Sequence, residues 1–400
     1  MSKASNYYYE QLNKEQQKVY YAMKEGLLNQ QDSFAVPMLD KKELSDIYFM
    51  VRMDCPEIFY SVRFSYRYYP DSTAVEFIPE YLFQKDKIRE HRQAMQARVK
   101  KLARQAQGLD EKGKELFIHD FIVQNVRYDK LKKEYSHEII GALGNGVAVC
   151  EGMAKAVKIL CDELGIWCII ALSEANHEKG IKYRHAWNVI KIGGQYYHLD
   201  ATFDNTLSKD DTIRYDYVNL SDKQIARDHE PVIWKVPACP DGDHFYYKEK
   251  KLSWTTTDEV RNRTRQAVKK GKILLFHWRG GYLTKEVLQE LLSIFSEEAK
   301  AKGKQSFVSV NRAQAVLRVR FQEGAGEEQI EMERLAKQRE REKAYREKRK
   351  AKKLAENGGE IIKTKVCPHC QKEFVPTSNR QIFCSKDCCY QARQDQKKAD

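Results

Sequence analysis

Three residues of the chain carry a thiol, an imidazole and a carboxylate in an order that suits nucleophilic chemistry: Cys150, His185 and Asp200. A cysteine attacks an amide carbonyl well only when a nearby group holds the sulfur as a thiolate and another protonates the leaving amine. Cys150 could be such a nucleophile. His185 could act as its base and acid, and Asp200 could orient the imidazole.

Cys150 is expected at the start of a helix. Apolar residues recur at helical spacing after it, namely Met153, Val157, Leu160 and Leu164, and Gly165 stands where a helix would end. The sulfur would then lie at the positive end of the helix dipole, beside N-H groups that have no partner within the helix. Such a setting favours a thiolate, and the same N-H groups can hold an oxyanion.

Gly193-Gly194 predicts a two-residue hairpin turn. The turn would join a strand from Ala186 to Ile192 to a second strand from Gln195 to Leu199. The two strands would pair antiparallel as a β-hairpin, and the turn would fix the register of the pairing.

That register predicts how the imidazole and the carboxylate meet. It places Trp187 opposite Asp200 and His185 opposite Thr202, so His185 and Asp200 become diagonal neighbours on one face. An imidazole and a carboxylate can bridge that separation. A register shift of one residue would put them on opposite faces.

The stretch from about Ser136 to Asn205 resembles the transglutaminase-like superfamily. The resemblance is carried by successive blocks of sequence: Gly141–Leu143, Val149–Gly152, Asp162–Ile166, His185–Asn188 and Tyr197–Thr202. It implies a papain-like core with the cysteine at a helix start and the histidine and aspartate on neighbouring strands. By this resemblance Cys150 is the nucleophile, His185 the general base and acid, and Asp200 the residue that orients His185.

Two residues depart from the family pattern. Met153 stands where members often have an aromatic residue, and Phe203 where Trp is common, so both are expected to alter the pocket wall.

His198 is an alternative catalytic imidazole, because the predicted register places it on the same face as Asp200. Trp187 is most simply a core aromatic residue, although it could also shield the ion pair from water.

Composition points to an intracellular chain of several domains. Its 400 residues can form two or three cores, and the first residues lack the apolar region of a signal peptide. We therefore expect a cytoplasmic protein without a membrane span. Its 10 cysteines are expected to be thiols and metal ligands rather than disulfides.

The pattern of elements predicts an α+β fold with five parts. They are an N-terminal mixed segment (1–105), the transglutaminase-like core (106–254), a small α/β module (255–322), a charged helical linker (323–359) and a zinc-ribbon-like module (360–400). The aromatic run Tyr7–Tyr9 could be a recognition surface, but a packed face is favoured. No chemical role follows from the sequence of the small α/β module.

The basic charge of the chain is concentrated in the linker. Between Arg334 and Lys353 there are 11 Lys or Arg and 3 Glu, a net +8 of the chain's +13. The stretch has almost no apolar stripe, so a solvated helical spacer is favoured over a nucleic-acid-binding patch.

The C-terminal part contains two pairs of cysteines with the spacing of a metal site. They are Cys367, Cys370, Cys384 and Cys388. Two short turns that present two thiolates each suit tetrahedral zinc, and a segment this short with few large apolar residues cannot otherwise form a core. The pattern resembles small zinc ribbons and predicts a structural zinc ion, with Cys389 and His369 as lower-ranked substitute ligands.

Two functions are compatible with these features. The first is a cysteine enzyme that acts on peptide or glutamine amide bonds through a thioester, with hydrolysis slightly preferred over amine transfer because no calcium loop is visible. The second is a non-catalytic peptide-binding or scaffold protein, docked on nucleic acid or on a protein partner through its basic helix and zinc module.

Overall fold

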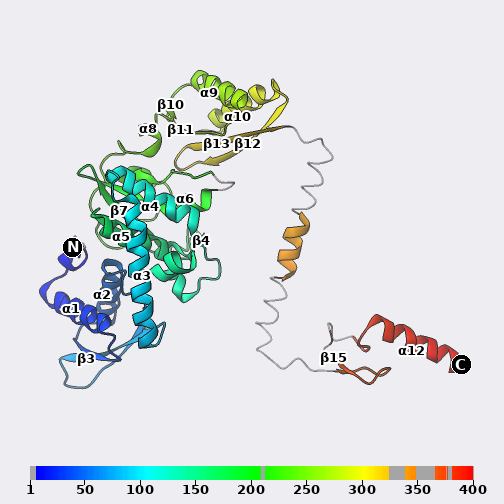
Figure 1. Cartoon of the computed structure of the whole chain (residues 1–400), viewed down its shortest axis with the longest axis horizontal. Helices are drawn as coiled ribbons and strands as arrows, with labels where there is room; N and C mark the ends of the chain where they lie inside the picture. The colour runs from blue at the N-terminus through cyan, green and yellow to red at the C-terminus, as the bar shows by residue number, and fades with distance from the viewer. Residues whose placement is uncertain are drawn as a thin grey trace. The chain divides into compact units, whose positions relative to one another are not determined.

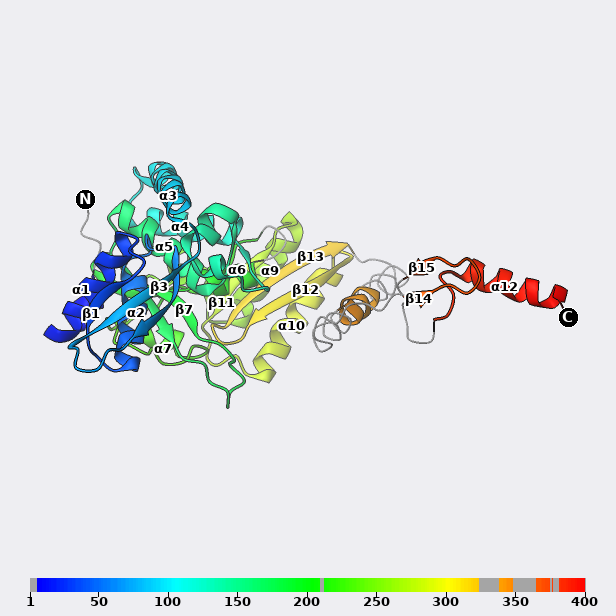
Figure 2. The ribbon, with the colours of Figure 1, turned by 90° about the horizontal axis from the view of Figure 1, so that it is seen from below.

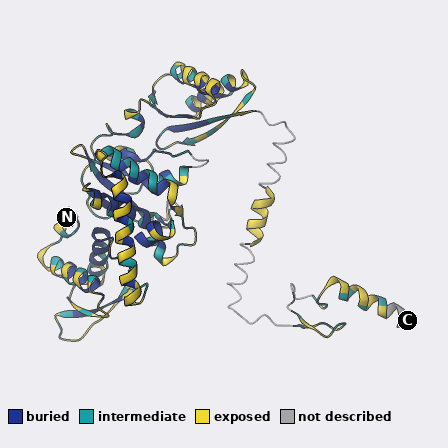
Figure 3. Cartoon of the chain, viewed as in Figure 1, coloured by how far each residue is buried: buried dark blue, intermediate teal, exposed yellow. Residues whose placement is uncertain are grey.

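The computed structural model describes residues 6–208, 212–323, 338–347, 365–374, 376 and 381–399. The fold is α+β and divides into two compact units, Met1–Glu323 and Gly324–Asp400 (Figure 1). Of the predicted charged linker the structure describes Glu323, which belongs to a strand, and 338–347, which is helical and exposed along its length (Figure 3). The rest of that prediction lies outside the described residues.

The first unit begins with helices around a small sheet. Its elements are η1 (Tyr9–Gln11), α1 (Lys14–Leu28), β1 (Phe34–Pro37), α2 (Lys41–Asp54), β2 (Ser61–Arg67), β3 (Ala74–Tyr81) and α3 (Lys85–Ala106). The strands form an antiparallel sheet in the order β1-β3-β2. Local signals account for the helix starts, since Asn13 forms a capping box with Gln16 and Asp40 accepts from the N-H of Glu43.

The N-terminal aromatic run packs into the protein, as the sequence predicts. Tyr8 is buried, and its hydroxyl donates to the carbonyl of Ile170 at 2.5 Å. The N-H groups of Tyr8 and Tyr9 donate to the buried carboxylate of Asp54. One hydrophobic cluster therefore runs from Tyr8 into the central part of the unit, as far as Val218.

A second sheet and a buried helix form the centre of the first unit. The elements are α4 (Glu111–Asn125), β4 (Arg127–Tyr128), η2 (Glu134–His137), η3 (Ile140–Asn145), β5 (Val147–Ala148), α5 (Cys150–Leu164), β6 (Cys168–Ser173), β7 (His185–Ile192), β8 (Gln195–Leu199), α6 (Ala201–Leu207), β9 (Val218–Leu220), α7 (Asp222–Ile225) and α8 (Tyr246–Glu249). Strands β6 to β9 form an antiparallel sheet in chain order. Helix α5 packs against this sheet, with α3 and α4 beside it (Figure 1).

The hairpin β7-β8 has the predicted turn and register. Gly193 and Gly194 have φ of 58° and 86°, which a tight primed turn requires and which side chains other than glycine rarely adopt. Ile192 pairs with Gln195, and the ladder continues to the pair of Asn188 and Leu199. The hairpin thus delivers His185 and Asp200 to the same end of the sheet.

The ladder stops before the two predicted pairs that involve Asp200 and Thr202. The chain leaves the sheet at Asp200, which is the N-cap of α6 rather than a strand residue. Its Oδ1 accepts hydrogen bonds from the N-H groups of Thr202 and Phe203 at 2.8 and 3.0 Å. The predicted pairing of Trp187 with Asp200 and of His185 with Thr202 is therefore wrong, because a helix cap replaces the extension of the strand.

The remainder of the first unit is the small α/β module, which starts two residues before the predicted boundary because the strand Ser253–Trp254 pairs with the strand Leu274–Trp278. It contains β10 (Ser253–Trp254), α9 (Thr257–Lys270), β11 (Leu274–Trp278), α10 (Lys285–Lys300), β12 (Lys304–Asn311) and β13 (Val316–Glu323). The sheet order is β10-β11-β13-β12. Helices α9 and α10 pack together against it around their own hydrophobic cluster (Figure 2).

The second unit contains β14 (Lys365–Val366), β15 (Glu373–Phe374) and α12 (Lys386–Ala399). The two strands pair antiparallel and flank the turn that carries the first two tail cysteines. Among the described residues, no helix combines the length and the apolar character that a membrane crossing requires.

Candidate active site

Cys150 is the first residue of α5, as predicted, and is partly exposed. Val149 precedes it as the N-cap and provides no side-chain cap, and Gly165 ends the helix in a left-handed conformation. The first N-H groups of a helix have no partner within it, so those beside the thiol can donate hydrogen bonds to a negatively charged atom.

The backbone passes very close to this helix start. A Cβ atom on Gly152 would lie 2.3 Å from the carbonyl oxygen of Ser136, so only glycine fits there. The same carbonyl accepts the N-H of Val149 at 2.9 Å. The glycine after Cys150 therefore allows η2 to hold the helix start in place.

Asn188 fixes α5 relative to the strand that carries the histidine. Its side-chain amide is buried and donates to the carbonyl of Ala154 in α5 at 3.0 Å and to that of Ile169 in β6 at 3.3 Å. The spacing between Cys150 and His185 is thus held by a buried hydrogen-bonded contact between helix and sheet.

His185 and Asp200 form a direct pair. The Nε2 atom of His185 lies 2.6 Å from Oδ2 of Asp200, and Cys150 is close enough to the imidazole to raise its pKa. Because Nε2 is occupied by Asp200, Nδ1 is the nitrogen left for the thiol. The structure therefore brings the three predicted residues together.

His185 and Asp200 each stabilise the charged form of the other. Burial by itself would lower the pKa of His185, but the Asp200 carboxylate and, after it, the nearby Cys150 raise it to about 10. Burial would raise the pKa of Asp200, but His185 and His229 hold it well below its ordinary value. At neutral pH the pair is an imidazolium and a carboxylate.

His229 is a second imidazole on the same carboxylate, and no sequence pattern pointed to it. Its Nε2 atom lies 2.9 Å from Oδ2 of Asp200. It follows α7, beyond the stretch that carries the family resemblance, and only the fold brings it to Asp200. Its single sequence signal is the neighbouring carboxylate of Asp228.

His198, the alternative imidazole, belongs to a different cluster. Its Nδ1 accepts from the indole N-H of Trp187 at 3.0 Å, and its Nε2 lies 2.8 Å from Asp222. Trp187 is a buried core residue, as predicted, and its ring stacks on His185 with centroids 5.8 Å apart. His198 therefore supports Trp187, and none of its described contacts is with Cys150 or Asp200.

A pocket of about 580 Å³ opens at Cys150 and His185. Its other walls come largely from the N-terminal segment and from the segment before β7; among the lining residues are Phe49, Arg52, Met53, Val62, Tyr128, Lys182 and Tyr183. Neither Met153 nor Phe203, which the sequence predicts to alter the pocket wall, is among the residues that line the pocket. Met153 is fully buried in the core, and Phe203 packs on the His185 ring with centroids 5.0 Å apart.

Tyr128 is a pocket residue that sequence reasoning did not select. It lies on β4, which pairs in parallel with β5, the strand that leads into Cys150. Burial, followed by the nearby Cys150, raises the pKa of its phenol to about 12. Its hydroxyl therefore stays protonated and can donate a hydrogen bond in the pocket.

A buried charge cluster supports the residue after Cys150. Lys155 lies 2.8 Å from Glu151, Arg52 of α2 lies 3.3 Å from it, and His137 lies 3.1 Å from it. Glu138 completes the cluster through ion pairs with Arg52 and Lys155. Burial would raise the pKa of Glu151, but Lys155 and Arg52, with the hydrogen bond to His137, hold it well below its ordinary value. The N-terminal segment is thereby tied to the helix start that carries the thiol.

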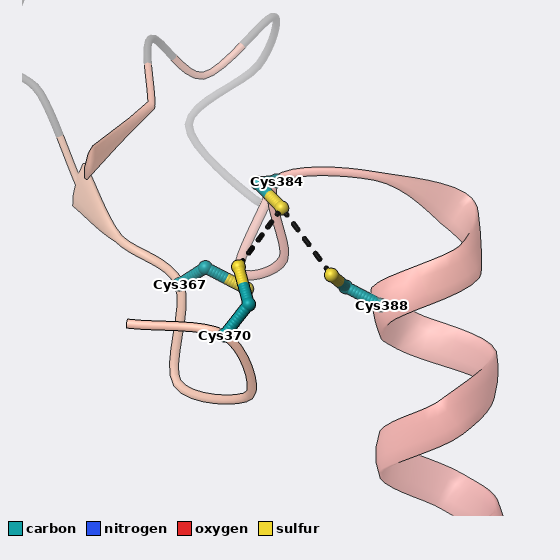
Figure 4. Close-up of side chains that lie close together, drawn as sticks. All are labelled: Cys367, Cys370, Cys384 and Cys388. Carbon is teal, nitrogen blue, oxygen red and sulfur yellow. Dashed lines mark hydrogen bonds between the residues drawn. The ribbon is translucent and has the colours of Figure 1, made fainter. Parts of the chain in front are cut away.

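The four predicted tail cysteines form one group in the second unit. The sulfur of Cys384 lies 3.4 Å from those of Cys370 and Cys388, with Cys367 adjacent (Figure 4). All four sulfurs lie within 4.8 Å of one another, a spacing that suits tetrahedral thiolate ligands, whose sulfurs are about 3.8 Å apart around zinc. Neither His369 nor Cys389 belongs to this group; His369 lies 3.3 Å from Gln391 instead.

A family model supports the assignment of the central part of the chain. The model described as the transglutaminase-like superfamily matches residues 100–201, which contain Cys150, His185 and Asp200. Residues 100–201 form a transglutaminase-like domain. His229 and the four tail cysteines lie outside the matched residues.

Two solved structures are similar to parts of the chain. One, from Cytophaga hutchinsonii, is described as a candidate cysteine protease; it is 17% identical, with a TM-score of 0.23, over 35% of this chain and 62% of that one. The other is described as a TGase; it is 11% identical, with a TM-score of 0.25, over 57% of this chain and 66% of that one. The chain thus spans less than two thirds of either. No curated protein matches it.

The raised pKa of His185 predicts how stability depends on pH. A folded pKa of about 10 against an ordinary 6.5 means that the His185–Asp200 pair stabilises the fold fully below pH 6.5 and loses that contribution as pH rises to about 10. Urea unfolding of wild type and Asp200→Asn should therefore differ most near pH 6 and progressively less up to pH 10.

Glu80→Gln is the control for this measurement, because Glu80 forms only an exposed ion pair with Arg63. Its stability should track wild type over the same range. A wild-type advantage over Asp200→Asn that stays constant from pH 6 to 10 would contradict the charge assignment.

Proposed function

We propose that the chain is a cysteine enzyme that acts on peptide or glutamine amide bonds through a thioester on Cys150. The observation that carries the proposal is the His185–Asp200 contact of 2.6 Å beside a thiol at a helix N-terminus. A pocket at the thiol offers room for a substrate side chain. The match of residues 100–201 to the transglutaminase-like family model supports the same proposal.

In the first step the Cys150 thiolate attacks the amide carbon. A carbon–sulfur bond forms, and the carbonyl electron pair moves to oxygen, near the free N-H groups at the start of α5. When the oxyanion collapses, the carbon–nitrogen bond breaks and the departing nitrogen takes the proton of His185. The products of this step are a thioester, a free amine and a neutral imidazole.

The second step returns the enzyme to its starting state. Neutral His185 removes a proton from water, and the resulting hydroxide attacks the thioester carbon. The carbon–sulfur bond breaks, a carboxylic acid leaves, and the thiolate–imidazolium pair forms again. An amine in place of water would give a new amide by the same route.

Hydrolysis is favoured over amine transfer by the surroundings of the pocket. Its rim includes exposed side chains such as Lys182, Tyr183 and Arg184. Water can reach a thioester in such a site, whereas amine transfer requires a pocket that excludes water.

Peptide mass spectrometry tests the proposal. A mixture of Gln- and Lys-containing peptides with a tagged primary amine is incubated with wild type, Cys150→Ala and Cys161→Ala. Wild type and Cys161→Ala should cleave or deamidate peptides, because Cys161 is buried in the same helix away from the pocket. Cys150→Ala should lose at least about 10³-fold of the rate.

The products identify the reaction. Cleavage or deamidation supports hydrolysis, and incorporation of the tag supports amine transfer. If no peptide changes with wild type, the chain is not the proposed enzyme, and a peptide-binding or scaffold protein that docks on nucleic acid or a protein partner becomes the better account.

We further propose that Cys367, Cys370, Cys384 and Cys388 hold a structural zinc ion. Four thiolates fill a tetrahedral coordination sphere and leave no position for a substrate. Zinc would replace the hydrophobic core that the short segment lacks. When bound, it would serve folding of the second unit and not the chemistry at Cys150.

Metal analysis of the full chain tests this site. Cys367→Ser with Cys370→Ser should abolish zinc retention, because two thiolates cannot hold a structural ion tightly. Cys389→Ser is the matched control and should retain one zinc per chain. Stoichiometric zinc in the double variant would refute the assignment.

A further inference from the structure

His229 lies in an almost closed aromatic environment next to the proposed active site. Its side chain is 1% exposed. The rings of Phe203, Trp187 and His185 surround it, with centroid distances of 4.5, 5.1 and 5.2 Å. A hydrogen bond to the end of α7 holds its backbone, since its N-H donates to the carbonyl of Ile225 at 3.0 Å. The imidazole therefore has one position and little contact with water.

Both ring nitrogens of His229 face carboxylates. Nε2 lies 2.9 Å from Oδ2 of Asp200, and Nδ1 lies 2.9 Å from Oδ1 of Asp228. A neutral imidazole has one N-H and could donate to only one of the two, which would leave a lone pair against the other carboxylate. An imidazolium donates to both.

We propose that His229 is a positioning residue, an imidazolium that bridges Asp200 and Asp228 and fixes the carboxylate that His185 uses. Its effect on turnover rests on the proposed function of Cys150, whereas its charge and its bridge do not. Asp200 then accepts four hydrogen bonds, from two backbone N-H groups on Oδ1 and from two imidazoles on Oδ2. Such a carboxylate cannot rotate away from His185.

The bridge connects the site to the small α/β module. Asp228 also accepts hydrogen bonds from the hydroxyl of Tyr217 and from the side-chain amide of Gln314, the latter at 3.4 Å. Gln314 is buried in the turn between β12 and β13, and Asn311 at the end of β12 donates to Tyr217 at 3.2 Å. The small α/β module, whose sequence suggests no chemical role, thus helps to hold Asp228, the second carboxylate partner of His229.

The second positive charge also affects proton release from His185. The titratable groups that face His229 are Asp200, Asp228, His185 and Tyr217, whose ring centroid lies 5.6 Å from that of His229. Burial lowers the pKa of His229, but its bonds to Asp200 and Asp228 raise it overall, while His185 opposes that rise. Because the repulsion is mutual, His185 holds its proton less tightly than a histidine with sole use of Asp200 would. A residue that must protonate a leaving amine benefits from this.

Nitrogen NMR of the imidazoles in the full chain, with turnover on a cleaved peptide, tests the proposal. In wild type at pH 7.5, both nitrogens of His229 should carry protons. His229→Gln keeps a donor for Asp200 but removes the charge, so the titration of His185 should move up by about half a pH unit or more. We expect kcat to fall about tenfold in His229→Gln with KM little changed.

His119→Gln is the matched control. His119 is equally buried and also bridges two carboxylates, at 3.0 Å from Asp120 and 3.1 Å from Asp204, but it contacts neither Asp200 nor His185. It should lose stability as His229→Gln does and leave the titration of His185 unchanged. The comparison separates a positioning role from a general loss of packing.

Three results would overturn the proposal. They are a neutral His229 in wild type at pH 7.5, an unchanged His185 titration in folded His229→Gln, and an equal shift in His119→Gln. If His229→Gln does not fold, the protonation of His229 in wild type decides alone. If wild type turns over no peptide while the NMR result holds, the proposed function fails and the charge bridge stands.

Discussion

The buried carboxylate of Asp200 is the point on which the arrangement of the site depends. Its two oxygens have separate tasks, since Oδ1 caps α6 through Thr202 and Phe203 while Oδ2 accepts from His185 and His229. A buried anion is costly unless all its acceptor sites are used, and here both cations and backbone N-H groups satisfy it. The cap fixes the direction of the carboxylate, and the carboxylate fixes the imidazole.

The thiol side of the site is held by different contacts from the imidazole side. Asn188 joins α5 to the sheet, and the absence of a side chain at Gly152 lets the Ser136 carbonyl approach the helix start. The charge cluster around Glu151 adds Arg52 from the N-terminal segment. Parts of the chain far apart in sequence, including the small α/β module through Gln314, therefore meet around the cluster of Cys150, His185 and Asp200.

The parts that local patterns control could be predicted from the sequence, and the parts that tertiary packing controls could not. The apolar spacing after Cys150 predicted α5, and Gly193-Gly194 predicted the register of the hairpin correctly as far as Leu199. The same register extrapolated wrongly to Asp200, because Asp200 is a favoured N-cap residue and starts a helix there instead of extending the strand. His229 and the pocket walls come from segments without a chemical motif, so only the fold reveals them.

The rate of Cys150 alkylation by iodoacetamide between pH 5 and 9 tests the central claim most directly. It compares wild type with Asp200→Asn, which keeps the size of the side chain and its capping ability. If the Asp200–His185 pair stabilises the thiolate, wild type should react well below pH 7, and Asp200→Asn should react at least about tenfold more slowly at pH 6. Equal rates in the two proteins, both following an ordinary thiol, would contradict the account.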